Sequence, residues 1–258
     1  QQDILQVCGK KPELLTSTSS KRCIIEIGPG QAALTKELIA GAKHIYCVEI
    51  DRDLAAWLRT KFTPEQLTVL EADALKFDWR DFAAEEKIRV VGNLPYNISS
   101  PLLFKLSEIS DRVVDQHFML QKEVVDRMVA APGSKAYGRL SVMLQRKYRM
   151  VKLFDVPPEA FTPAPKVMSS VVRMIPIQNP AEVDEETFHQ VVAASFAMRR
   201  KTLKNNLAKW ISPEMMEEAG IKPEQRAESV PLENFIRLAR LVHAAGISIV
   251  LPGQVQPD

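Results

Sequence analysis

The chain has 258 residues, of which 46% are apolar and 26% charged, and its formal net charge is +2. This composition is typical of a folded, water-soluble protein with one large domain, or one domain and a smaller one. No run reaches the roughly 18 to 20 apolar residues that a membrane helix needs, and the first residues carry no signal-peptide pattern. The three cysteines form no CxxC pair, so we expect reduced thiols in a cytoplasmic protein and no metal site.

The first two-thirds of the chain alternate short apolar runs with amphipathic segments. The apolar runs predict strands at 23–27, 44–50, 67–70, 88–91, 115–120 and 169–175. The amphipathic segments predict helices at 33–40, 52–61, 101–107 and 122–130. Such alternation indicates an α/β fold, in which a parallel sheet is flanked by helices and ligands bind at the carboxyl ends of the strands.

The last third of the chain has a different pattern. We expect the proline-rich passage at 156–165 to be an ordered loop, because proline is disfavoured in helix interiors and central strands. After a linker at 178–180, helices are expected at 185–197, 201–210, 213–219 and 232–245. The sequence therefore predicts an α/β domain over residues 1–177 and a small all-helical domain over residues 178–258.

Basic residues gather in two stretches that contain no acidic residue. One lies between Asp126 and Asp155, and the other lies between Glu186 and Glu214. The second stretch holds Arg199, Arg200, Lys201, Lys204 and Lys209. Local positive charge of this kind is expected where a protein binds nucleic-acid phosphates, and two solvated faces that happen to be basic are the alternative.

A glycine turn, EIGPG at residues 26–30, follows the first strand and precedes a helix. Glycines here permit tight backbone geometry and close approach of a ligand, but a GxG without a third glycine is weak evidence by itself. Context strengthens the signal, because Glu49 ends the next strand about 20 residues later, where an acid can bind a ribose diol. Asp73 follows the third strand, where it can accept a hydrogen bond from an adenine amine.

These acids restrict the kind of ligand. Glu26, Glu49 and Asp73 around one pocket would repel a pyrophosphate, and the glycine loop has no Lys or Arg to offset them. A ligand with ribose and adenine, no phosphate, and an ammonium or sulfonium cation fits better, and S-adenosylmethionine is such a ligand. The alternative is that the acids cap helix N-termini, which explains any one of them more easily than the series.

The fourth strand runs into the unusual sequence Asn93-Leu94-Pro95-Tyr96. An adenine N6 amine is a poor nucleophile because its lone pair is delocalised into the ring. The Asn93 side-chain oxygen and the Leu94 carbonyl can accept its two hydrogens and so favour a pyramidal nitrogen. Pro95 disfavours a helical conformation at Leu94, and Tyr96 can stack on a base taken out of its helix. A proline turn with a core tyrosine is the alternative.

Several segments together resemble those of the small-subunit ribosomal RNA adenine dimethyltransferases. They are EIGPG, VEIDRDL, EADAL, GNLPYNISSPLLFKL, FMLQKEVVDRMVAAPGSKAYGRLSVM, VPPEAFTPAPKV and RRKTLKNNL, and the resemblance extends from about residue 4 to about residue 244. It implies a Rossmann-like class I methyltransferase domain with a mostly parallel sheet, plus a small helical domain. The implied activity is S-adenosylmethionine-dependent dimethylation of N6 of two adjacent adenosines, in the 3′-terminal hairpin loop of small-subunit (16S-type) rRNA, during ribosome biogenesis.

The resemblance also implies roles for matching positions. Those implied for the cofactor are Glu26, Gly28, Gly30, Glu49, Ile50, Asp73, Ala74 and Asn93. Those implied for the target adenosine are Asn93, Leu94, Pro95, Tyr96 and Phe161. Those implied for contact with rRNA are Arg199, Arg200, Lys201 and Lys204, in a basic helical segment. We expect a monomer that needs no metal and acts on the small ribosomal subunit. Family members carry a GQNFL-like segment over the pocket, just upstream of where this sequence begins, and we expect cofactor affinity and turnover to depend on it.

Three alternatives stay open. Large-subunit rRNA adenine methyltransferases of the antibiotic-resistance type share the cofactor and amine motifs, whereas FTPAPKV and RRKTLKNNL favour the small subunit. A ribosome-assembly factor that acts mainly by binding is the second alternative, against which Asn93 and Tyr96 favour catalysis. Methylation of adenine in DNA is compatible with the chemistry but not with the later motifs.

Overall fold

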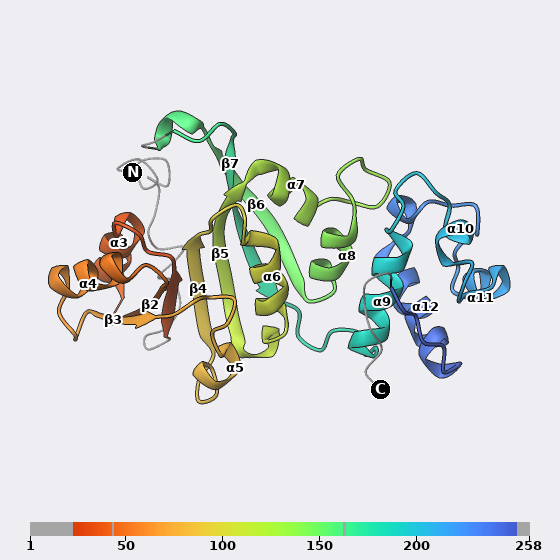
Figure 1. The fold of residues 1–258 in the computed structure, drawn as a ribbon, viewed down its shortest axis with the longest axis horizontal. Helices are drawn as coiled ribbons and strands as arrows, with labels where there is room; N and C mark the ends of the chain where they lie inside the picture. Colours follow the sequence, from red (N-terminus) through yellow and green to blue (C-terminus); the bar gives the residue numbers. More distant parts are fainter. Residues whose placement is uncertain (1–22, 43, 162–163, 252–258) are drawn as a thin grey trace. The chain divides into compact units, whose positions relative to one another are not determined.

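The computed structural model describes residues 23–42, 44–161 and 164–251 (Figure 1). The chain divides into two compact units. The first, which we call the sheet unit, comprises residues up to 125 and residues 148–176. The second, the helical unit, comprises residues 126–147 and the residues from 177 onward.

A seven-stranded sheet forms the centre of the sheet unit, with the order β3-β2-β1-β4-β5-β7-β6 among the described residues. Its strands are β1 (Ile24–Ile27), β2 (Ile45–Glu49), β3 (Leu67–Glu71), β4 (Ile88–Asn93), β5 (Val113–Gln121), β6 (Tyr148–Val156) and β7 (Ser169–Pro176). Strands β1 to β5 pair in parallel, and β7 pairs antiparallel with both β5 and β6. The strand order reverses between β1 and β4, so a topological switch point lies at their carboxyl ends.

Helices follow most of the parallel strands. They are α3 (Ala33–Gly41), α4 (Arg52–Lys61), α5 (Trp79–Phe82) and α6 (Ser99–Ser107), with short 3₁₀ turns at Ser110–Arg112 and Pro158–Ala160. Leu38 of α3 and Leu58 of α4 pack in one apolar cluster with Ile45 and Leu67 of the strands. The inner strands are buried on both faces, as expected for a parallel sheet covered by helices.

The helical unit has its own apolar core. Its helices are α8 (Arg139–Gln145), α9 (Glu185–Ser195), α10 (Leu203–Leu207), α11 (Pro213–Glu218) and α12 (Leu232–Ala244), with a 3₁₀ turn at Ala227–Ser229. Helix α7 (Lys122–Met128) begins in the sheet unit and ends in the helical unit. Phe188 of α9 and Phe235 of α12 share the core with Val142 of α8 and Tyr137. The Tyr137 hydroxyl donates to the Val230 carbonyl at 2.9 Å, which satisfies this buried polar group.

The expected α/β fold with a mostly parallel sheet and a helical C-terminal part is confirmed. All of the expected strands and helices are present, with ends that differ by a few residues. Among the described α-helices and strands, α5, α8 and β6 were not expected. Strand β6 lies at the edge of the sheet, where Arg149, Val151 and Leu153 are exposed, so its sequence does not alternate between apolar and polar residues.

Two further details differ from the sequence-based expectations. Residues 126–147 belong with the helical unit rather than with residues 1–177, because Tyr137 and Val142 pack into the helical core. The helix expected at 201–210 is limited to α10, since the Thr202 side chain caps it by accepting from the Asn205 N–H. Arg199, Arg200 and Lys201 therefore lie in the turn before α10, and Lys204 alone of the four expected RNA contacts is helical. No helix in the described ranges is long and apolar enough to span a bilayer.

Candidate active site

A pocket of about 370 Å³ lies at the switch point, beside the residues that end or follow β1 and β4. This volume falls within the range of about 300 to 1,000 Å³ common for small-molecule sites. Its lining comprises Glu26, Gly28, Pro29, Gly30, Gln31, Ala33, Leu34, Asn93, Leu94, Pro95, Tyr96, Phe161, Pro165 and Ser169. The glycine turn and the 93–96 segment, which are far apart in the sequence, thus share one cavity.

The glycine turn presents open backbone to this pocket. Gly28 and Gly30 have φ values of 63° and 54°, in the left-handed region that favours glycine. A Cβ atom built on either residue would have no atom of the described residues within 4 Å, so these residues leave the space beside both glycines open. The Gly28 N–H donates to the Val48 carbonyl at 2.9 Å, which ties the turn to β2. A ligand can therefore approach this backbone closely.

Two carboxylates lie behind the glycine turn. Glu26 is 2% exposed, and its Oε2 accepts a hydrogen bond from the Thr35 hydroxyl at 2.6 Å. Burial raises the pKa of Glu26 to about 7; the Thr35 hydrogen bond opposes this rise, and the charge of Glu49 adds to it. Glu49 accepts from the N–H groups of Gly30 at 3.3 Å and Asp51 at 3.0 Å. Glu49 thereby holds the glycine turn as well as ending β2.

Four residues expected to hold the cofactor are close in sequence to the strand ends but are not in the pocket lining: Glu49, Ile50, Asp73 and Ala74. Ile50 is 66% exposed directly after β2. The Asp73 side chain accepts from the Leu75 N–H at 2.9 Å, and the Ala74 carbonyl accepts from Trp79 Nε1 at 2.9 Å. The Ala72 N–H donates to the Glu49 carbonyl at 3.0 Å, which joins the Asp73 loop to the end of β2.

The 93–96 segment is anchored at Leu94 and open on either side. Leu94 is 1% exposed and its N–H donates to the Met119 carbonyl at 3.1 Å. Asn93 and Pro95 are exposed, and Tyr96 retains 43% of its surface, so Tyr96 is not a core residue. Within the part of the chain that the structure describes, neither the Asn93 amide nor the Leu94 carbonyl has a hydrogen-bond partner. Both acceptors are therefore available to a ligand.

Phe161 lines the same pocket as Tyr96. It packs partly buried against a small apolar cluster of Met119, Val156 and Ala160. The cluster supports one side of the Phe161 ring. The pocket lining therefore includes two aromatic side chains, Tyr96 and Phe161, from separate segments of the sheet unit.

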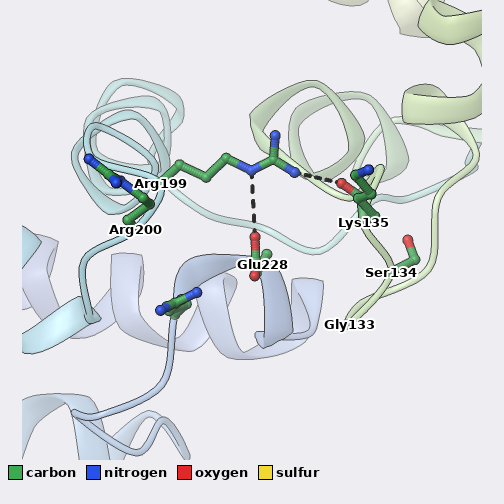
Figure 2. A pocket seen from close by; sticks show the side chains of 7 residues that line it. Gly133, Ser134, Lys135, Arg199, Arg200 and Glu228 are labelled. Carbon is green, nitrogen blue, oxygen red and sulfur yellow. Dashed lines mark hydrogen bonds and ion pairs between the residues drawn. The ribbon is translucent and has the colours of Figure 1, made fainter.

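A second cavity, also of about 370 Å³, lies in the helical unit (Figure 2). We call it the basic recess; its lining comprises Gly133, Ser134, Lys135, Arg199, Arg200, Arg226 and Glu228. Figure 2 shows Arg199 reaching across from its turn to Lys135 and Glu228. It donates to the Lys135 carbonyl at 2.7 Å, and its Nε is 3.7 Å from a Glu228 carboxylate oxygen.

The basic recess has a strong positive excess, with four cationic side chains and one carboxylate. Among the described residues, the side chains of Lys135, Arg200 and Arg226 have no ion-pair partner. Lys201 and Lys204 are exposed but do not line the recess. Lys135 belongs to the first acid-free stretch, which was expected to favour phosphate binding, whereas Arg226 was not expected from the sequence.

The described residues contain no cluster of three or more His, Cys, Asp or Glu side chains that could hold a metal ion. Burial raises the pKa of both Cys23 and Cys47 to about 12, so these thiols stay neutral. Cys8 lies outside the described residues.

Comparison with known proteins gives consistent results. A family model described as "Ribosomal RNA adenine dimethylase" matches residues 8–244. The chain is 58% identical over 226 residues to Ribosomal RNA small subunit methyltransferase A of Bordetella avium (strain 197N). This alignment covers 87% of this chain and 86% of that protein. The chain is also 53% identical over 218 residues to the protein of the same name from Herminiimonas arsenicoxydans, and this alignment covers 84% of this chain and 86% of that protein.

Two solved structures share the fold. A dimethyladenosine transferase from Plasmodium falciparum aligns with a TM-score of 0.76 and 24% identity, over 93% of this chain and 99% of that one. The 23S rRNA methyltransferase ErmE aligns with a TM-score of 0.68 and 23% identity, over 89% and 94% of the two chains. The family match and the relatives confirm the resemblance seen in the motifs, and the chain belongs to the ribosomal RNA adenine dimethylase family.

Proposed function

We propose that this protein is an S-adenosylmethionine-dependent enzyme that dimethylates N6 of two adjacent adenosines in the 3′-terminal hairpin loop of small-subunit (16S-type) rRNA. The observation that carries the proposal is that the glycine turn with Glu26 and the 93–96 segment line one pocket. The names of the relatives support the small subunit as the substrate, and the family description supports adenine as the base and two methyl groups as the product.

The pocket's charge fits this cofactor. Among the described residues, the pocket lining contains no Lys or Arg, and the buried Glu26 carboxylate has no cationic partner. Such a pocket disfavours a phosphate and favours a cation, while the open backbone at Gly28 and Gly30 leaves room for a ligand. S-adenosylmethionine, when bound, supplies an electrophilic methyl group. The residues proposed to hold it are Glu26, Gly28, Gly30, Glu49, Ile50, Asp73, Ala74 and Asn93.

The 93–96 segment is proposed to hold the target amine. The Asn93 side-chain oxygen and the Leu94 carbonyl accept the N6 hydrogens, and both are free to do so in the described structure. Each methylation would form one N–C bond as the S–CH₃ bond of the cofactor breaks, would release one proton from N6, and would leave S-adenosylhomocysteine. Pro95 fixes the backbone of this segment, and Tyr96 and Phe161 offer aromatic faces to the flipped base, as enzymes that act on an extruded base commonly do.

The basic recess is proposed to bind rRNA phosphates. Arg200 and Arg226 are exposed and without carboxylate partners in the described residues, so a phosphate can pair with them. Lys201 and Lys204 would extend this contact on the exposed surface. We also propose that the enzyme acts as a monomer in the cytoplasm.

Methylation of purified ribosomal subunits tests the proposal. Unmodified small subunits are incubated with the protein and methyl-labelled S-adenosylmethionine, and the labelled nucleotides are mapped, with large subunits and DNA as parallel substrates. We expect label on two adjacent adenosines of the small-subunit hairpin loop. Label in large-subunit rRNA or in DNA, or no label, would contradict the proposal, and binding without label would favour the assembly-factor alternative.

A further inference from the structure

Glu26 is a buried carboxylate that has no counter-ion in the part of the chain that the structure describes. It lies in the central strand β1, is 2% exposed, and lines the pocket. Its one hydrogen bond from a described side chain comes from Thr35, and no Lys or Arg of the described residues pairs with it. A buried charge without a partner is costly. A cationic ligand group that enters the pocket would supply the missing partner.

Thr35 is placed to orient this carboxylate. It is the third residue of α3, directly behind the glycine turn, and is 0% exposed. Its hydroxyl donates to Glu26 Oε2 at 2.6 Å, a length expected for a hydrogen bond to an ionised group. A threonine hydroxyl has a single proton to donate, and here it is given to Glu26. Thr35 thus fixes one carboxylate oxygen and leaves the other for the pocket.

We propose that Thr35 is a positioning residue for cofactor recognition, whose hydroxyl holds the Glu26 carboxylate ionised and oriented toward the α-ammonium group of the cofactor's amino-acid part. This inference rests on the proposed function, because it requires S-adenosylmethionine in this pocket. It also predicts that binding of the ammonium group is linked to loss of a proton from Glu26.

The surroundings of Glu26 set the direction of this linkage. Strand β2 contributes two titratable groups near Glu26: Cys47, which is in register with it, and Glu49. On the other side of Glu26, strand β4 places the apolar Val91 in register with it. Helix α3 contributes the Thr35 hydroxyl. Burial, opposed by Thr35 and assisted by Glu49, raises the pKa of Glu26 to about 7, and Cys47 stays neutral because burial raises its pKa to about 12. Below about pH 7 the unliganded protein therefore carries a proton on Glu26 that the ammonium group must displace.

The expected pH profile has two limbs. On the acid side, affinity falls as the pH decreases below about 7, by up to about tenfold per pH unit when one proton is released on binding. On the alkaline side, affinity falls as the ligand's α-amino group, with a pKa of about 8, loses its own proton. Affinity is therefore highest between about pH 7 and pH 8. A ligand without the amino-acid part should show neither limb.

Two nucleosides, one with the α-ammonium group and one without it, show whether Thr35 positions Glu26 for that group or only stabilises the fold. S-adenosylhomocysteine carries the α-ammonium group, and 5′-methylthioadenosine has the same adenosine and a thioether but lacks the amino-acid part. Binding of each is measured by calorimetry between about pH 6 and pH 9, for the wild type, Thr35→Val and Thr35→Ser. Thr35→Val removes the hydroxyl with little change in shape, and Thr35→Ser retains the hydroxyl as the matched control.

We expect Thr35→Val to bind S-adenosylhomocysteine about tenfold or more weakly at pH 7.5, in line with loss of a hydrogen bond to a charged group. Its acid limb should also move to higher pH, because the hydroxyl normally opposes the rise in the pKa of Glu26. Binding of 5′-methylthioadenosine should change by less than about twofold, and Thr35→Ser should match the wild type. Equal weakening of both nucleosides, or unchanged binding of S-adenosylhomocysteine, would overturn the inference.

A variant of Glu26 itself tests the same proposal if Thr35→Val does not fold. Glu26→Gln has no titrating carboxyl at this position, so its binding of S-adenosylhomocysteine should be weaker than that of the wild type and independent of pH between about 6 and 7. An acid limb that persists in Glu26→Gln would overturn the inference. If the wild type methylates small subunits but shows no such pH and ligand dependence, only the role of Thr35 fails. If the wild type binds neither nucleoside, the proposed function itself fails.

Discussion

The basic recess makes a quantitative prediction about binding to the small ribosomal subunit. We select Arg200 and Arg226 because both are exposed and unpaired among the described residues, whereas Arg199 is bound to the Lys135 carbonyl and lies near Glu228. Replacing both by alanine, Arg200→Ala with Arg226→Ala, should therefore remove phosphate contacts without disturbing the fold.

The magnitude follows from counterion release. Each phosphate contact contributes about 0.9 to the slope of log affinity against log salt concentration for a duplex. Two lost contacts lower the slope by about 1.8, and a rise from 50 to 200 mM salt spans about 0.6 log units. Over this range the wild type should lose about tenfold more affinity than the double variant. At low salt the double variant should bind more weakly, because its two phosphate contacts are absent.

The assay is equilibrium binding to unmodified small subunits at fixed magnesium and several salt concentrations. A matched control, Lys222→Ala with Arg237→Ala, changes the net charge by the same amount at exposed positions of the helical unit outside the recess. The control should keep the wild-type slope. If the double variant also keeps that slope, the recess is not a phosphate site. If the control loses as much slope as the double variant, net charge rather than the recess governs binding.

Three other variants test the site and the fold. Tyr96→Phe should retain binding of the target loop, whereas Tyr96→Ala should weaken it by about 1 to 3 kcal/mol in a subunit-binding assay, because stacking on a base is lost; equal behaviour of the two would exclude stacking. Asp115→Asn should lower the free energy of unfolding at pH 7 by about 3 kcal/mol, since Arg89 donates to Asp115 at 2.9 and 2.6 Å and would be left buried without a carboxylate. Burial alone would raise the pKa of Asp115, but the hydrogen bonds and charge of Arg89 outweigh it and hold this pKa below its ordinary value. The difference in unfolding free energy between wild type and Asp115→Asn should therefore be full at neutral pH and shrink as the pH falls below about 4. A difference that does not change with pH would contradict the ion pair. Tyr137→Phe should lower the stability by about 1 kcal/mol in denaturant titration, because Val230 loses a buried donor, and an unchanged midpoint would contradict the value of this bond.

The inner strands could be predicted from sequence because burial on both faces makes them continuous apolar runs. Strand β6 could not, because it is an edge strand with Arg149 and Val151 both exposed. The assignment of residues 126–147 to the helical unit depends on Tyr137 and Val142 packing against helices about fifty or more residues later, which no local pattern encodes. Local periodicity therefore predicts elements better than it predicts which core they join.

The candidate site divides in the same way. The order of a parallel sheet brings strand ends to one edge, so the meeting of Glu26 with the 93–96 segment follows from sequence and topology. The basic recess combines residues near positions 135, 199 and 226, whose proximity arises only from the packing of the helical unit. The hydrogen bond from Thr35 to Glu26 is likewise invisible in sequence, because threonine early in a helix has many other uses.

The proposed methyl transfer depends most on Asn93 as the acceptor of the target amine. The most direct test measures single-turnover methylation of small subunits by Asn93→Ala, together with its affinity for S-adenosylhomocysteine. Because Asn93 ends β4 on the exposed rim of the pocket and its side-chain amide has no hydrogen-bond partner among the described residues, the variant should fold normally. We expect methyl transfer at saturating cofactor to be slower by about 100-fold or more, as for loss of one well-placed polar group at a reaction centre. Cofactor affinity should fall far less, because the seven other residues proposed to hold the cofactor remain. Methyl transfer at the wild-type rate would contradict the account.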